Sequence, residues 1–295
     1  PSLDQGRLWF LDRMQGRSAL YNIPAAFHLR GSPRAPPLEV ALLERALRQL
    51  LERHPALRTR FPMVEGTIQA VRREQVRLEL REVDLGGVEP ASREASLRQE
   101  LEEAASRPFD LAEDLLVRAT LWRLGEREHV LLVVMHHIVS DGWSLRVFFQ
   151  ELSRLYEGLR AGRPAALPAP RIDYADFARW QRELLTHDAQ REHLRFWRER
   201  LEGAPEVLLL PTDRARPAVQ SYRGRVLRFH LSAELQEGLR ALGRRYGTTL
   251  FMTLQAAFAS LLARYTGSDD IVIGSPVANR GRSELEGLVD AEGGY

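Results

Sequence analysis

The chain has 295 residues, of which 44% are hydrophobic and 28% are charged. This balance is typical of a folded protein with a large core and excludes a disordered chain. The 42 basic residues are all arginine and exceed the 40 acidic residues by a net charge of +2. Arginines alternate with glutamates, as in Arg198-Glu199-Arg200, which indicates helix faces with local ion pairs and argues against nucleic-acid binding.

Missing residue types exclude further classes. The sequence has no cysteine, which excludes a disulfide scaffold, a thiolate metal site and a cysteine nucleophile. No apolar run approaches the roughly 18 residues that a membrane helix needs. The first residues, Pro1-Ser2-Leu3-Asp4, lack the basic and hydrophobic regions of a secretion signal. We therefore expect a cytoplasmic protein without a membrane partner.

Hydrophobic periodicity predicts helices and strands in the first half of the chain. In chain order it predicts a helix at Leu38–Leu51, extended segments at Arg58–Phe61 and Leu78–Val83, a helix at Ser92–Ser106, strands at Leu115–Trp122 and His129–Met135, and a helix at Leu145–Leu159. The strand at His129–Met135 is apolar on both faces, so we place it in the middle of a sheet. Ser144 is the expected N-cap of the helix that follows.

A proline-rich segment at 161–171 divides the chain, because proline neither propagates a helix nor pairs in a sheet. We expect an N-terminal lobe at 1–160, a connector at 161–171 and a second lobe at 172–295. The second lobe is predicted to contain a helix at Tyr174–Leu201, an extended segment at Arg225–Leu231, helices at Ala233–Tyr246 and Leu250–Tyr265, and a strand at Ile271–Gly274. The mixture of elements indicates an α/β protein.

Two adjacent histidines, His136 and His137, follow the central strand and precede Asp141-Gly142. Imidazole exchanges protons near neutral pH, and sites gather where strands of layered α/β folds end. Because neighbouring strand residues point to opposite faces, the two histidines do not easily hold one ion, and we predict no metal. No Gly-x-Ser-x-Gly surrounds Ser140 or Ser144, as a serine hydrolase would need. The residues alone leave open a purely structural histidine pair.

The pattern His-His-x-x-x-Asp-Gly at His136–Gly142 resembles the signature of condensation domains of nonribosomal peptide synthetases, which are relatives of chloramphenicol acetyltransferase. Other segments resemble the remaining motifs of that family in the same order. They are Ser2, Gln5, Arg7 and Trp9 with Tyr21–Pro24, then Arg53–Phe61, Tyr174–Gln181 and Ile273–Arg280. The resemblance implies an α/β fold (an α+β sandwich) of two chloramphenicol-acetyltransferase-like lobes.

The resemblance implies amide bond formation between a donor acyl or peptidyl thioester and the amine of an acceptor aminoacyl thioester. Trp143-Ser144-Leu145 after Asp-Gly favours condensation of an L-donor with an L-acceptor over an epimerization domain, and the two histidines exclude a heterocyclization domain. The domain itself would bind no cofactor. Both substrates would arrive on 4′-phosphopantetheine arms of upstream donor and downstream acceptor carrier domains, beside an adenylation domain. Alternatives are an acyltransferase of the same superfamily using free thioesters and a catalytically silent docking module.

The motif assigns roles residue by residue. His137 would accept a proton from the amine or hold the amine and the oxyanion by a hydrogen bond. The Gly142 N–H would face the oxyanion, and glycine would permit close backbone approach. Asp141 is expected to be structural and to pair with Arg58, or alternatively with Arg60. The remaining site residues are His136, assigned to structure, and the substrate-tunnel candidates Trp143 and Ser144.

The resemblance ends before the chain does. Family members usually continue Gly-Phe-Phe-Val-Asn-Thr after the segment that matches Ser283–Val289, whereas this sequence reads Asp290–Tyr295. We therefore expect the second lobe to be truncated at its C-terminal end. This departure is the observation that favours the silent docking module.

Overall fold

The computed structural model describes residues 1–32, 34, 36–76, 78–170, 172–184, 187–222, 224–275 and 287–289. The chain forms two compact units, Pro1–Thr186 with Pro276–Tyr295, and His187–Ser275. The sequence suggests a connector at 161–171, whereas the units divide after Thr186. The helix α5 (Tyr174–Leu184) therefore belongs to the first unit.

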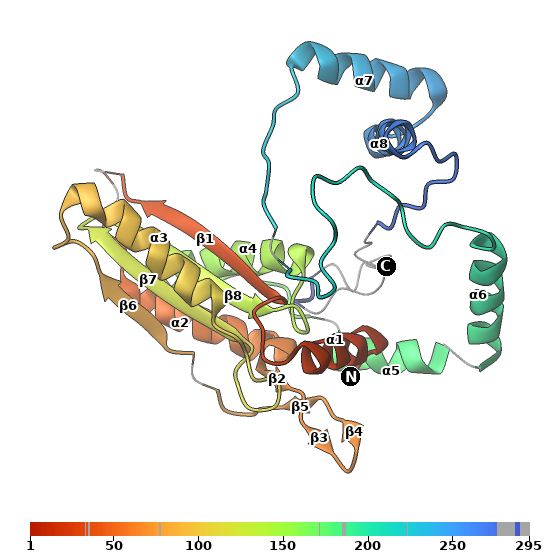
Figure 1. Cartoon of the computed structure of the whole chain (residues 1–295). Coiled ribbons are helices and arrows are strands. Elements are labelled where there is room, and N and C mark those ends of the chain that lie inside the picture. The colour runs from red at the N-terminus through yellow and green to blue at the C-terminus, as the bar shows by residue number, and fades with distance from the viewer. Residues whose placement is uncertain are drawn as a thin grey trace. The chain divides into compact units, whose positions relative to one another are not determined.

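A four-stranded mixed sheet forms the centre of the first unit (Figure 1). Its order is β1–β8–β7–β6, with β1 at Asn22–Arg30, β6 at Leu80–Asp84, β7 at Val117–Gly125 and β8 at Glu128–His136. β8 is antiparallel to both neighbours, and β6 is parallel to β7. The predicted strands β6, β7 and β8 are confirmed, and β8 is buried from His129 to His136, as a central strand requires.

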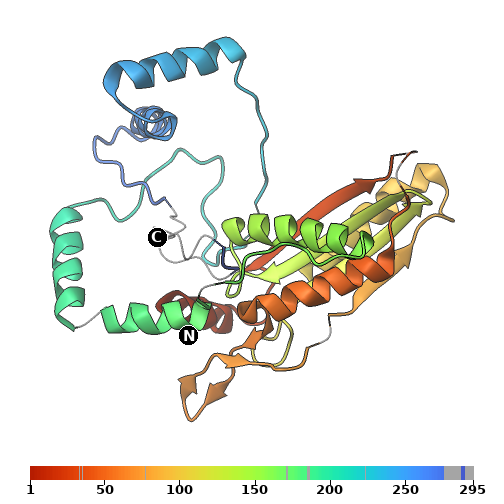
Figure 2. The same cartoon turned by 180° about the vertical axis from the view of Figure 1, so that it is seen from behind.

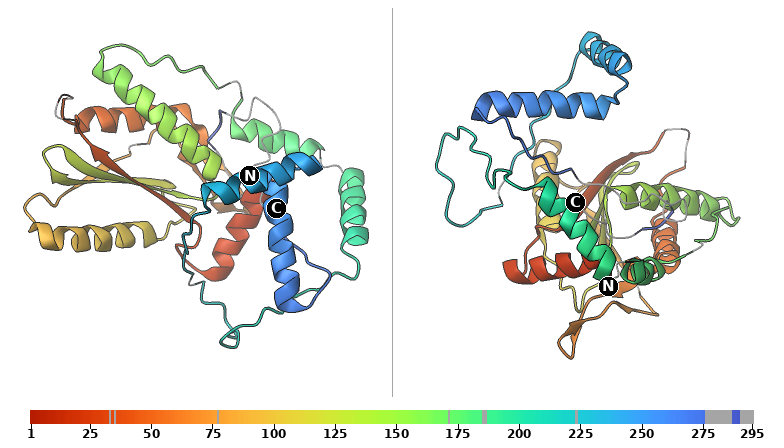
Figure 3. Two further views of the ribbon diagram at one scale, coloured as in Figure 1. Left: turned by 90° about the horizontal axis from the view of Figure 1, so that it is seen from above. Right: turned by 90° about the vertical axis from the view of Figure 1, so that its right-hand side faces the viewer.

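Helices cover both faces of this sheet, as the view from above shows (Figure 3, left). α2 (Val40–Arg53) and α4 (Gly142–Arg160) lie on one face, and α3 (Pro90–Ser106) lies on the other. The view from behind has α2 and α4 in front of the strands (Figure 2). All three predicted helices are confirmed. β8 lies between two strands and is buried from His129 to His136, which matches its apolar sequence.

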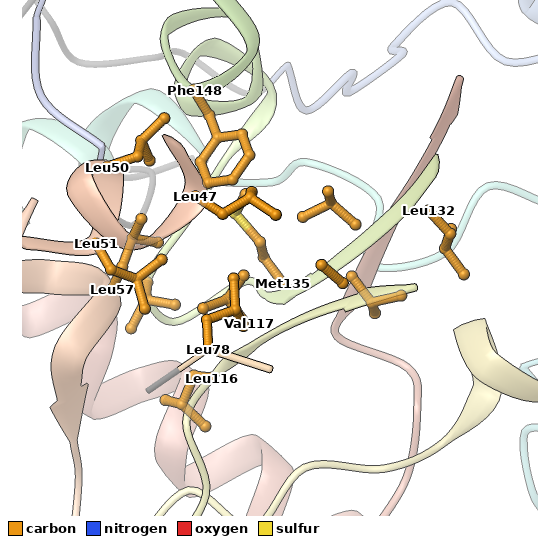
Figure 4. Packing of buried hydrophobic residues seen from close by; sticks show 14 of the residues in the cluster. Leu47, Leu50, Leu51, Leu57, Leu78, Leu116, Val117, Leu132, Met135 and Phe148 are labelled. Carbon is orange, nitrogen blue, oxygen red and sulfur yellow. The ribbon is translucent and has the colours of Figure 1, made fainter. Parts of the chain in front are cut away.

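Aliphatic side chains fill the core between the sheet, α2 and α4 (Figure 4). Leu47, Leu50 and Leu51 of α2 are at most 1% exposed and pack in one cluster with Phe148 of α4 and Met135 of β8. Each fully buried leucine side chain contributes roughly 1.5–3 kcal/mol to folding. This cluster holds the end of β8 near the start of α4, where the candidate site lies.

Short elements follow α2. They are the 3-10 turn η1 at Pro55–Arg58 and the strands β2 at Thr59–Arg60, β3 at Met63–Val64, β4 at Thr67–Ile68 and β5 at Val71–Arg72. β2 pairs with β5, and β3 with β4. Between β3 and β4, Glu65 and Gly66 have φ of 50° and 74°, and two successive positive φ values are what a two-residue type I′ hairpin needs.

The second unit contains α6 (His187–Arg200), α7 (Ala233–Tyr246) and α8 (Leu250–Thr266). α7 and α8 are confirmed. Of the helix predicted at Tyr174–Leu201, the structure describes α5 and α6 as separate helices, and residues 185–186 between them lie outside the described residues. The predicted strand at Ile271–Gly274 is wrong, since these residues form no ladder. Among the described residues no single helix is long and apolar enough to cross a membrane; α7 and α8 meet that test only as a pair bent by 102°.

Candidate active site

The candidate site is the turn at residues 137–141, between the end of β8 at His136 and the start of α4 at Gly142. The N–H of His137 donates to the carbonyl of Tyr21 at 2.8 Å, which extends the pairing of β1 and β8 by one residue. The N–H of Val139 donates back to the carbonyl of His136 at 3.0 Å. The main chain that carries His137 is therefore tied to the edge of the sheet on one side and to its own turn on the other.

His136 is enclosed in the first unit, with 0% of its surface exposed. Its Nδ1 accepts the N–H of Ile138 at 3.1 Å, so the proton of the neutral ring is on Nε2. Nε2 lies 3.8 Å from Oδ1 of Asp12. Burial lowers the pKa of His136 and outweighs the opposing effect of Asp12. The ring is thus neutral near pH 7 and holds the turn through Nδ1.

His137 differs from its neighbour in exposure. His137 is half-buried, whereas His136 is fully buried. Adjacent residues at the end of a strand project to opposite sides, which explains why only one of the two imidazoles is enclosed. Of the two histidines, only His137 is partly accessible to solvent.

Asp141 starts α4. It is 1% exposed, and its Oδ1 accepts the main-chain N–H of Ser144 at 2.6 Å while its carbonyl accepts the N–H of Leu145 at 3.1 Å. Asp141 is therefore the N-cap, and the prediction that Ser144 caps the helix is wrong. The helix begins at Gly142 because an aspartate side chain reaches the N–H three residues ahead.

The predicted pair between Asp141 and Arg58 is wrong. Arg58 Nε and Nη2 donate to the carbonyls of Leu51 at 2.8 Å and Glu52 at 3.1 Å, in the last turn of α2. Its Nη1 donates to the carbonyls of Arg73 at 3.0 Å and Glu74 at 3.4 Å. The carbonyls in the last turn of a helix lack helical partners, and the planar guanidinium satisfies them. Burial lowers the pKa of Arg58.

The alternative partner, Arg60, does not pair with Asp141 either. Its Nη1 lies 3.3 Å from Oε2 of Glu113. Arg58 thus acts on the fold by joining the end of α2 to the segment after β5, and Asp141 acts as a helix cap. The sequence misses this division because an arginine bound to four main-chain carbonyls leaves no pattern in the residue types.

The three residues after Asp141 lie in the first turn of α4. Gly142 is exposed, and a Cβ atom at this position would meet no other atom within 4 Å. Packing within the protein therefore does not require a glycine here. Trp143 is half-buried, and the guanidinium carbon of Arg146 lies 4.7 Å from its ring centroid. Ser144 is fully buried. Of the two tunnel candidates, only Trp143 reaches solvent.

The first, second and fourth motif segments gather near this turn. Gln5 of α1 (Leu3–Gln15) donates from Nε2 to the carbonyl of Ile138 at 3.1 Å, and Trp9 donates from Nε1 to the carbonyl of Phe61 at 2.9 Å. Tyr174 of α5 donates its hydroxyl to Oγ of Ser2 at 2.8 Å. The fifth segment lies mostly outside the described residues, as does the tail at 290–295.

The sequence does not identify Gln5 as a site residue beyond its place in a motif. A signal for its local structure is present, because Ser2-x-x-Gln5 has the spacing of a capping box at a helix start. The structure has that box, with both reciprocal hydrogen bonds. No local pattern indicates the bond to Ile138, which lies 133 residues away.

Comparison with known proteins adds the family. The family model "Condensation domain" matches residues 2–290. A linear gramicidin synthase from Brevibacillus parabrevis is 48% identical over 98% of this chain, which spans 6% of that protein. The chain covers 63% of the X-domain from teicoplanin biosynthesis, at 33% identity and a TM-score of 0.82.

A solved condensation domain shows the same fold. The first condensation domain of the CDA synthetase superposes with a TM-score of 0.78 at 23% identity, and the chain covers 68% of it. The mixed α/β architecture is therefore the chloramphenicol-acetyltransferase-like fold that the motifs imply. On the family match over 2–290 and these likenesses, the chain belongs to the condensation domain family of nonribosomal peptide synthetases.

Proposed function

We propose that this chain forms an amide bond between two tethered substrates. The amine nitrogen of an acceptor aminoacyl thioester attacks the carbonyl carbon of a donor acyl or peptidyl thioester. The carbon–sulfur bond breaks, and the proton lost by the amine ends on the released thiol. The observation that carries this proposal is the fixed turn that presents the half-buried His137 beside the first turn of α4, in a chain that matches the family model over residues 2–290.

His137 is assigned to the attacking amine. An α-amine has a pKa of about 8 in solution, so part of it is already neutral at pH 7–8. A ring nitrogen of His137 then either removes the remaining proton or orients the amine by accepting a hydrogen bond. Both roles require a fixed imidazole, which the hydrogen bond from the His137 N–H to Tyr21 supports.

We assign the N–H of Gly142 as the hydrogen-bond donor to the oxyanion that forms when the amine attacks the donor thioester. Gly142 is the first residue of α4, and the first N–H groups of a helix lack helical acceptors and favour negative charge. The open space around Gly142 supports access by a substrate. Asp141 contributes by fixing where the helix starts. Trp143 is assigned to the border of the substrate passage.

Both substrates are proposed to be L-configured and to arrive on 4′-phosphopantetheine arms. One arm belongs to an upstream donor carrier domain and the other to a downstream acceptor carrier domain, next to an adenylation domain. The domain itself would hold no cofactor, because the arms supply the thioesters. The match to a small part of a much longer synthase supports partners of this kind.

An aminoacyl transfer assay tests the proposal. Donor and acceptor carrier domains are loaded with L-aminoacyl groups, mixed with this chain, and the acceptor carrier is analysed by mass spectrometry. We expect a dipeptidyl acceptor carrier. Product from free thioesters alone would instead identify an acyltransferase of another kind, and a folded chain that binds loaded carriers without product would contradict the proposed activity.

A further inference from the structure

A chain of buried hydrogen bonds runs from α5 to the turn that carries His137. The Tyr174 hydroxyl donates to Oγ of Ser2 at 2.8 Å, and Ser2 Oγ also accepts the N–H of Gln5 at 3.1 Å. Nε2 of Gln5 donates to the carbonyl of Ile138 at 3.1 Å. Tyr174, Ser2 and Gln5 are 7%, 1% and 3% exposed, so water does not substitute freely for these contacts.

The Gln5 side chain is held in one orientation. Its Oε1 accepts the N–H of Ser2 at 3.0 Å, while its Nε2 faces the Ile138 carbonyl. Rotating the amide by half a turn would put donor against donor at Ser2 and acceptor against acceptor at Ile138. Each end of this amide therefore fixes the other.

Gln5 binds the main chain at Ile138, the residue directly after His137. The N–H of Ile138 goes to Nδ1 of His136, the N–H of His137 goes to the Tyr21 carbonyl, and the Ile138 carbonyl goes to Gln5. Among these contacts, the one from Gln5 comes from a helix outside the sheet and the turn. Losing it frees one end of the main chain that orients His137.

We infer that Gln5 is a positioning residue for His137, and that Ser2 and Tyr174 couple the position of α5 to it. This inference rests on the proposed function, because it concerns how well His137 is placed for the amine. Tyr174 is the first residue of α5, which ends at Leu184, just before the second unit begins in sequence at His187. A displacement of α5 would thus reach the turn through three side chains.

Two substitutions at Gln5 separate positioning from folding. Gln5→Glu keeps an acceptor for the Ser2 N–H, and glutamate is a normal member of the capping box, but its carboxylate has no hydrogen to donate to the Ile138 carbonyl at neutral pH. Gln5→Met removes both contacts at similar volume. We expect either variant to lower kcat by roughly 10- to 100-fold, because small misplacements of a catalytic group have effects of this size. KM should change little.

Matched controls remove similar bonds elsewhere. Gln181→Met deletes a bond from Leu3 N–H to Gln181 Oε1, which also joins α1 to α5 but does not reach the turn. Tyr156→Phe deletes a hydroxyl that accepts the Glu39 N–H at 3.0 Å and serves as control for Tyr174→Phe. Tyr174→Phe should lower kcat less than Gln5→Met does, and adding it to Gln5→Met should have little further effect. Both controls should retain kcat.

A second readout does not depend on activity. The imidazole resonances of His137 are assigned with His137→Gln and titrated by NMR in each variant. Gln5→Glu and Gln5→Met should shift or broaden them, and Gln181→Met should not. If the wild type makes no amide yet these resonances respond, the proposed function fails and the positioning role stands. If Gln5 variants lower only thermal stability, with kcat per folded molecule and the His137 titration unchanged, Gln5 is purely structural and the inference is overturned.

Discussion

The carboxylate of Asp141 accepts the main-chain N–H of Ser144 at 2.6 Å, and this contact sets the first turn of α4 directly after the turn that holds His137. A cap of this kind depends on an acceptor oxygen more than on a negative charge, since asparagine and serine cap helices about as well as aspartate. The geometry therefore makes Asp141 a test of whether the site needs its charge.

We expect Asp141→Ala to reduce the free energy of unfolding by about 1–2 kcal/mol, the usual cost of a lost N-cap. Asp141→Asn keeps the acceptor and should cost clearly less. Urea denaturation followed by circular dichroism measures both. An equal and large loss for the two variants would show that the charge, not the cap, matters.

The separation of Asp141 from Arg58 predicts energetic independence. Arg58→Met leaves main-chain carbonyls of the α2 terminus and the segment after β5 without their donor, so it should destabilise the first unit by roughly 2–4 kcal/mol. In a double-mutant cycle with Asp141→Asn, the two losses should add within about 0.5 kcal/mol. A coupling energy of several kcal/mol would show that Asp141 and Arg58 interact directly and would contradict the prediction.

Glu151 predicts a pH dependence of stability. Its Oε2 lies 2.7 Å from His54 Nε2 and 2.9 Å from Arg53 Nε, which joins the end of α2 to α4. Burial raises the pKa of Glu151, but the hydrogen bonds and charges of His54 and Arg53 outweigh it and lower the pKa below the ordinary value. The carboxylate therefore binds protons more readily in the unfolded chain than in the folded one.

This stabilisation should be complete above the pKa of an unfolded glutamate, about 4.3, and should be lost as the pH falls through the lower folded value. Denaturation between pH 3 and 7 should show a steeper loss for the wild type than for Glu151→Gln. Glu44→Gln is the control, because Glu44 pairs with Arg48 at 3.7 Å and is 40% exposed. Identical pH profiles for wild type and Glu151→Gln would contradict the prediction.

Periodicity predicts α2 and β8 because their buried positions are apolar and regularly spaced. It fails for α1, whose buried residues include the polar Gln5 and Asp12, and for β1, where Pro24 argues against a strand and fits only an edge. These two polar residues interrupt the apolar pattern of α1 because they face the site. Gln5 donates to the carbonyl of Ile138, and Oδ1 of Asp12 lies 3.8 Å from Nε2 of His136.

The motif identifies the residues of the site, but not the hydrogen bonds that hold them in place. His137 and Asp141 stand in one short segment of the sequence, and their neighbours along the chain are sufficient to place them between a strand and a helix. The bonds of Gln5 to Ile138 and of Arg58 to the end of α2 join distant or unpatterned residues through main-chain carbonyls. Such contacts depend on tertiary packing, which residue types alone do not encode.

The most direct test of the proposed activity is the single-turnover rate of dipeptidyl transfer between loaded carrier domains for the wild type, His137→Ala and the control His28→Gln. His28 pairs with Glu128 at 2.8 Å at the far end of β1 and β8. We predict that His137→Ala lowers the rate by roughly 10²- to 10⁴-fold, the range for loss of a general base, while His28→Gln retains it. A His137→Ala protein that is folded and forms the amide at the wild-type rate would contradict the assignment of His137.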